Sequence, residues 1–187
     1  FEIGQQLVSG KFLITGGVMG FGEGSIWSIA PPSDLVGAEL HGFGWLDDLA
    51  ALGDKPAKAK AQAWIISWID GFGMGEGPGW SADLTGRRLM RWINNSSFLF
   101  SHLSKSQKDR ICHSMALQVL LLAKSWRQAQ PGWARFEALC GLVCASQSLV
   151  GMGFLLAPAL RALVQECQTY INIDGGINSR NPEELLV

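Results

Sequence analysis

The sequence predicts an all-α protein, on three observations. Most of the chain after residue 35 carries apolar side chains at the three- and four-residue spacing of an amphipathic helix. Proline and glycine clusters separate these segments. A strand-like run occurs only near the start. Several of the later helices are apolar around much of their circumference and must be covered on more than one side, so we expect layered helical hairpins.

Residues 1–35 are predicted to form a short extended, glycine-rich arm. The run Lys11-Phe12-Leu13-Ile14-Thr15, followed by Gly16-Gly17, is typical of a strand that ends in a turn. Helix signals begin only after Pro31-Pro32. The chain is therefore divided into this arm and a helical domain over residues 36–187.

The first two helices are predicted near 37–52 and 55–70. Gly53-Asp54 ends the first helix, and the second has Trp64 and Trp68 one turn apart. The glycine-rich segment 71–79 cannot be helical and is expected to be a mobile loop of the kind that often borders a site.

The rest of the chain is predicted to be helical, with breaks at proline and glycine. Pro131-Gly132 separates two long apolar segments. The expected helices lie near 81–93, 97–103, 106–126, 133–150 and 154–173.

The uncharged stretch from Ala138 to Leu160 is long enough to cross a bilayer. Polar residues, glycines and Pro158 interrupt it, which favours two buried helices that meet at a glycine turn. We expect the hairpin, and a membrane span is the minor alternative.

Composition excludes some classes of partner and cofactor. The formal net charge is −1, and the cluster Lys55, Lys58 and Lys60 is the main basic feature, so we expect no nucleic-acid partner. His41, His102 and His113 lack metal-ligand spacing, and no phosphate-binding loop or nucleophile motif is present, so no metal or cofactor is expected. The four cysteines are interpreted as small buried hydrophobes.

The closing residues predict a helix that begins and does not finish. Asn181 is a good N-cap, Pro182 suits the first helical position, and Glu183 and Glu184 place negative charge in the first turn. Since the chain also begins at Phe1, we expect a piece of a longer polypeptide, truncated at its C-terminus.

Several segments, in order, carry a resemblance to a known family. They are Gly10-Lys11-Phe12, the segment from Leu40 to Leu49, Trp80 with the segment from Arg87 to Ile93, Asp174-Gly175-Gly176, and the segment from Ser179 to Pro182. Together they resemble the N-terminal helical part of bacterial heparinase II/III-like proteins, nearly end to end. The resemblance implies a partial (α/α) toroid of helical hairpins, which in such proteins precedes a β-sandwich domain, and it suggests the periplasm.

The resemblance also implies an activity, β-elimination on a uronic-acid-containing polysaccharide. In such lyases an Asn with a neighbouring His or Arg neutralises the uronate carboxylate, while Tyr and His act as base and acid; fixed donors stabilise the charge that develops on that carboxylate. The implied catalytic residues are Asn94 and Asn95. The implied substrate-binding residues are Trp45, Trp80, Trp92, Arg180 and Asn181. The expected partners are an acidic polysaccharide or oligosaccharide and the β-rich domain of the same polypeptide.

The chain differs from the heparinase II/III-like pattern at positions where such proteins carry His or Tyr. Ser96 and Ser97 follow the Asn pair, Ile177 stands where relatives often have His, and Glu184 and Leu185 occupy the place of the catalytic Tyr. The alternative is a non-catalytic helical scaffold that binds glycans or protein partners. In that case Asn94 and Asn95 would cap a helix. Full burial of the tryptophans, together with the absence of a cleft near Asn94 or Arg180, would exclude a sugar groove.

Overall fold

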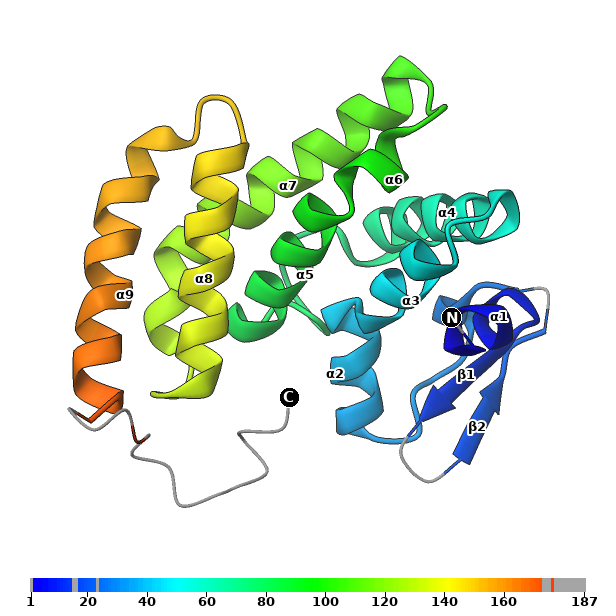
Figure 1. Cartoon of the computed structure of the whole chain (residues 1–187), viewed down its shortest axis with the longest axis horizontal. Helices are drawn as coiled ribbons and strands as arrows, with labels where there is room; N and C mark the ends of the chain where they lie inside the picture. Colours follow the sequence, from blue (N-terminus) through cyan, green and yellow to red (C-terminus); the bar gives the residue numbers. More distant parts are fainter. Residues whose placement is uncertain (1, 15–16, 23, 173–175, 177–187) are drawn as a thin grey trace.

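The computed structural model describes residues 2–14, 17–22, 24–172 and 176, and they are mostly helical (Figure 1). The prediction of an all-α protein is confirmed. The helices are α1 (Glu2–Val8), α2 (Asp34–Gly42), α3 (Gly44–Leu52), α4 (Lys55–Phe72), α5 (Ala82–Asn94), α6 (Ser96–Phe100), α7 (Lys105–Ser125), α8 (Trp133–Ser148) and α9 (Leu156–Tyr170). Short 3-10 turns lie at η1 (Ile26–Ser28), η2 (Trp126–Gln128) and η3 (Gly153–Leu155).

The N-terminal segment contains more structure than an extended arm. Helix α1 precedes an antiparallel hairpin of β1 (Lys11–Ile14) and β2 (Gly17–Gly20). The register pairs Phe12 with Met19, and both side chains are buried, as is Leu7 of α1. The strand is where the sequence predicts it. Helix α1 was missed because its single apolar face is too short to give a clear period.

The helix expected over 37–52 is two helices joined at Phe43. Phe43 has φ 64° and ψ 28°, a left-handed conformation that ends α2 and begins α3. This conformation strains a residue with a side chain, and only strong packing maintains it. Phe43 is fully buried and provides that packing. The flanking Gly42 and Gly44 were the sequence signal for a break.

The longer helices begin at well-formed N-caps. The Asp54 carboxylate accepts from the Ala57 N–H at 2.8 Å, and Pro56 lies in the first turn of α4. Ser104 and Gln107 form a reciprocal capping box at the start of α7. These caps explain why the expected starts of α4 and α7 agree with the structure to within a residue.

The closest helix packing joins α5 to α8. A methyl group on Gly86 would lie 2.8 Å from the Ala138 Cα, and one on Gly141 would lie 2.7 Å from the Gly86 carbonyl carbon. The two backbones therefore touch, and only glycine fits at the crossing. Helix α9 packs on the other side of α8, at the left edge of the molecule in Figure 1.

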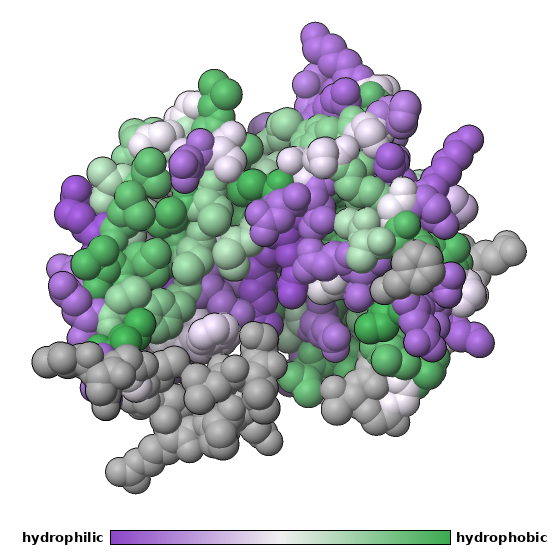
Figure 2. Space-filling view, in the orientation of Figure 1, coloured by the Kyte–Doolittle hydropathy of each residue, from purple (hydrophilic) through white to green (hydrophobic). Residues whose placement is uncertain are grey.

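The uncharged stretch forms the helical hairpin that the sequence favours. Helices α8 and α9 meet at a turn that includes Gly151, with φ 86°, and η3. Among the described residues, no helix combines the length and the apolar character that a bilayer crossing requires. Apolar side chains nevertheless remain exposed on this hairpin, and Figure 2 shows the resulting apolar area over α8 and α9. They include Val150, Phe154, Leu160 and Val164.

Candidate functional site

The structure places most of the tryptophans in one aromatic cluster inside the core. The ring of Phe43 lies 4.7 Å from Trp45, 5.7 Å from Trp68 and 5.4 Å from Trp92, centroid to centroid. We call this group, with its connected rings, the aromatic cluster; its members are Phe21, Trp27, His41, Phe43, Trp45, Trp64, Trp68, Phe72, Trp80 and Trp92.

The prediction that Trp45 and Trp92 line a sugar groove is wrong. Trp45 is 1% exposed and Trp92 is 0% exposed, so neither ring offers a face to a ligand. Trp80 is half-buried, and its indole N–H donates to the Phe72 carbonyl at 2.6 Å. Its ring packs on Trp68. Helical spacing of tryptophan does not distinguish a core ring from a binding ring, and packing prevails here.

A fully buried arginine, Arg88, lies between this cluster and helix α7. Its guanidinium carbon is 4.2 Å from the centroid of Trp68 and 5.3 Å from that of Trp80. Its nitrogens donate to the His41 carbonyl at 3.1 Å and the Gly79 carbonyl at 2.7 Å. They also donate to side-chain oxygens of Gln118 and Thr85. Hydrogen bonds and ring faces replace the missing carboxylate partner.

Burial also sets the charge of the neighbouring groups. It lowers the pKa of Arg88 to about 9, so the guanidinium stays charged at neutral pH. Burial, together with the positive charge of Arg88, lowers the pKa of His41 to about 4. The neutral imidazole accepts the Trp68 indole N–H on its Nδ1 at 3.0 Å. This network joins the end of α2 to the end of the glycine-rich loop, and its side chains are buried.

Sequence reasoning did not identify Arg88 as a key residue. Its position carried a signal, because Thr85, Arg88 and Trp92 recur at helical spacing on the face of α5 that also holds Leu89. A charged residue within a buried stripe predicts a satisfied internal cation.

The two asparagines differ in role. The Asn95 side-chain amide donates to the Arg91 carbonyl at 3.0 Å and to Asp47 at 2.7 Å, and its backbone N–H also bonds the end of α5. It is therefore a helix cap, although its φ of −97° is not left-handed. Asn94 is exposed. Arg180 and Asn181 lie outside the described residues.

Asn94 lines a cleft of about 430 Å³ between α5 and α8. Arg91 forms an ion pair with Asp47 at 3.0 Å, and Arg87 forms one with Glu137 at 2.7 Å. The remaining lining residues are Met90, Trp133, Phe136 and Cys140. Figure 2 shows a hydrophilic band at the centre of the molecule, beside the apolar area over α8 and α9.

The charges in this cleft are largely neutralised within the chain. Each arginine is held by a carboxylate, which leaves no cation aimed at a ligand carboxylate. Burial raises the pKa of Glu137, although the nearby Arg87 opposes that shift. Asn95 is engaged as a helix cap, whereas Asn94 is exposed on the lining of the cleft, so the assignment of carboxylate neutralisation to these two residues stays a prediction.

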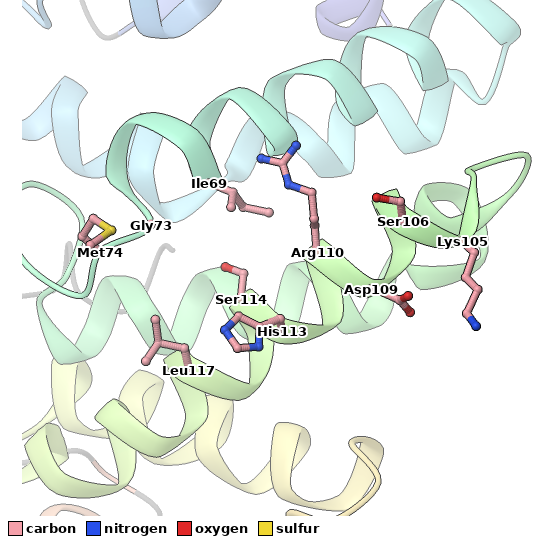
Figure 3. Close-up of a pocket in the computed structure, with 10 residues that line it drawn as sticks. All are labelled: Ile69, Gly73, Met74, Lys105, Ser106, Asp109, Arg110, His113, Ser114 and Leu117. Carbon is pink, nitrogen blue, oxygen red and sulfur yellow. The ribbon is translucent and has the colours of Figure 1, made fainter.

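A larger groove, of about 880 Å³, runs between the end of α4 and the first half of α7 (Figure 3). Arg110 reaches from α7 towards α4, where it forms an ion pair with Asp70. Ile69, Met74 and Leu117 provide apolar lining. The other lining residues are Gly73, Lys105, Ser106, Asp109, His113 and Ser114. The sequence predicted a loop that borders a site here, but it did not indicate the part played by α7.

Histidine, cysteine and carboxylate side chains of the described residues form no group that could hold a metal ion. Cys140, Cys144 and Cys167 are half-buried, in the region where α8 meets α9. Cys112 is exposed, so the interpretation of all four cysteines as buried hydrophobes is wrong for this residue.

Comparison with curated proteins finds a relative whose name refers to FtsZ. The chain is 30% identical over 189 residues to FtsZ-localized protein C of Caulobacter vibrioides. The match covers 98% of this chain and 32% of the relative, so the chain spans about a third of the length of that protein. No family model matches the chain, and no solved structure matches it.

This comparison corrects the expected activity and partners. The relative is named for its localisation with FtsZ and not for a lyase, so the expectation of a polysaccharide lyase with an acidic polysaccharide partner is wrong. The resemblance to heparinase II/III-like proteins itself stays a prediction.

Proposed function

We propose that this chain associates with assemblies of FtsZ through protein–protein contact. The observation that carries the proposal is the match of nearly the whole chain to FtsZ-localized protein C. The chain corresponds to a third of that relative, and we assign the association with FtsZ to this matched third.

The surface of the chain supports a binding role. Exposed apolar side chains gather on the α8–α9 hairpin, where Val150 and Phe154 are 103% and 68% exposed. Met74 is 84% exposed beside the groove along α7. Large exposed apolar side chains that lie close together mark interaction surfaces. By contrast, the arginines that line the cleft beside α5 are paired with carboxylates of the same chain.

The experiment is localisation in living cells. A fluorescent fusion of this chain would be expressed in Caulobacter vibrioides together with labelled FtsZ, and that organism's own FtsZ-localized protein C would serve as the positive control. We expect the fusion to overlap the FtsZ signal, while the fluorescent protein alone stays diffuse. A fusion that is intact, folded and diffuse in cells with assembled FtsZ would contradict the proposal.

We also propose that the helices follow the path of a partial (α/α) toroid and share ancestry with the helical part of heparinase II/III-like proteins. The α8–α9 hairpin and the stacking of α5, α8 and α9 support this arrangement. An experimental structure of a longer relative tests it. Successive hairpins that curve around a common axis are expected, and a bundle without such an axis would contradict the proposal.

A further inference from the structure

We propose that the groove between α4 and α7 binds a segment of a partner protein that carries carboxylates next to apolar side chains. The inference rests on the proposed function, which makes FtsZ the first partner to test. The groove combines a suitable shape, an apolar lining and positive charge on α7.

The groove has the size and lining of a peptide-binding site. Its volume of about 880 Å³ exceeds that of the cleft beside α5, and two neighbouring helices form its walls. Ile69 and Leu117 provide apolar contacts from opposite walls (Figure 3). Grooves between helices with an apolar floor commonly receive the apolar side chains of a partner segment.

Met74 extends the apolar lining into the glycine-rich loop. It lies between Gly73 and Gly75, and Gly75 has φ 92°, which favours glycine. Because its side chain is 84% exposed, Met74 contributes little buried apolar area to the stability of the fold. Methionine is flexible and polarizable, so it adapts to the apolar side chains of different partners.

The first half of α7 is largely exposed to solvent. Between residues 104 and 113, Ile111 alone is buried. The C-terminal half holds the remaining buried residues of the helix, among them Met115, Val119 and Leu122. The exposed half therefore forms an accessible wall of the groove.

Positive charge on α7 complements an acidic partner. The first half of the helix carries Lys105, Lys108 and Arg110 against one acidic residue, Asp109, while the chain as a whole has a net charge of −1. Of these four residues, Lys105, Asp109 and Arg110 line the groove. Among the described residues, no carboxylate lies within ion-pair distance of Lys105 or Lys108. Asp70 partly neutralises Arg110.

This charge does not serve the helix itself. Basic residues near the start of a helix oppose its dipole, whereas acidic residues there stabilise it. The first turn of α7 has no acidic residue. An acidic partner would relieve this repulsion, and complementary charge would guide its approach.

The apolar lining favours a protein over a polyanion or a membrane surface. A nucleic acid offers phosphates but few apolar side chains for Ile69, Met74 and Leu117 to bind. An anionic membrane would contact the lysines without filling a groove between two helices. These alternatives become outcomes of the experiment.

The test is co-sedimentation of the purified chain with assembled FtsZ. The charge variant is Lys105→Glu with Lys108→Glu, and the apolar variant is Met74→Asp. The control variant, Lys11→Glu with Lys55→Glu, makes the same change in net charge on exposed residues away from both the groove and the α8–α9 hairpin. Far-ultraviolet circular dichroism checks that every variant is folded.

We expect the charge variant to lower the affinity for FtsZ at least about tenfold. The Met74 variant should weaken it as well, the control should stay within about twofold of wild type, and added salt should weaken wild-type binding. Groove variants that bind like wild type would overturn this inference, and so would a control that loses as much affinity as the charge variant.

Two further outcomes separate this inference from the proposed function. If the purified wild-type chain sediments with FtsZ and the groove variants sediment equally well, the groove proposal is wrong and the proposed function stands. If the purified chain binds anionic phosphatidylglycerol vesicles through Lys105 and Lys108 and does not bind FtsZ, the groove proposal is also wrong. Absence of localisation in cells would contradict the proposed function independently of the groove variants.

Discussion

Replacing Arg88 with methionine is expected to lower the free energy of unfolding by about 3–5 kcal/mol. The buried guanidinium donates to the carbonyls of His41 and Gly79 and to the side chains of Gln118 and Thr85. Methionine has a similar length but no donor, so the two carbonyls and the Gln118 oxygen would stay buried without this partner. Each such loss costs about 1–3 kcal/mol, and relief of the buried charge offsets part of the total.

The assay is chemical denaturation followed by far-ultraviolet circular dichroism. Arg88→Lys keeps the charge, but a compact ammonium cannot reproduce the guanidinium fork, so its stability should fall between those of wild type and the methionine variant. Arg161→Met is the control, because Arg161 is exposed on α9 and its loss should cost no more than about 0.5 kcal/mol. A methionine variant within about 1 kcal/mol of wild type would refute the claim that this network stabilises the fold.

Three other perturbations have expected outcomes. The lowered pKa of His41 means that the unfolded chain binds the proton more readily than the folded one, so stability is complete above the ordinary pKa of 6.5 and is lost as pH falls towards about 4. The loss should approach about 3 kcal/mol in denaturation curves, and His41→Asn, which keeps an acceptor, should reduce it. Gly141→Ala should lower the free energy of unfolding by about 3 kcal/mol, because the added methyl group would meet the Gly86 backbone. Gly71→Ala is the control, since Gly71 has open space around it, and it should be neutral or stabilising. Thermal unfolding measures both variants. Ser104→Ala removes the α7 cap and should cost about 1 kcal/mol by chemical denaturation; an unchanged midpoint would show that the cap contributes little.

The extent of the helices could be predicted because their ends carry local signals. Asp54 and Ser104 accept from the first turns of α4 and α7, and such caps depend on neighbouring residues alone. The break at Phe43 could not be predicted in the same way. Its left-handed conformation is maintained by contacts with Trp45, Trp68 and Trp92, which come from three other positions in the sequence.

The candidate site was harder to predict for a similar reason. Apolar spacing shows which face of a helix is buried, but it does not show which buried residues meet. Trp45 and Trp92 were therefore assigned to a surface that they do not reach. The groove along α7 depends on the packing of α4 against α7, so no local sequence motif predicts it. What the sequence did show was the glycine-rich loop that contains Met74.

The aromatic cluster determines which structural changes the intrinsic tryptophan fluorescence of this protein can detect. Six of the eight tryptophans are in the cluster, and the other two, Trp126 and Trp133, lie at the connection between α7 and α8. No tryptophan lies in α9. Excitation energy passes readily among indoles at such short separations, so the emission of the six clustered tryptophans will act as one collective signal from the half of the chain before α6. A rearrangement confined to α9 would leave that signal almost unchanged, and an emission probe would need to be introduced on α9 to detect it.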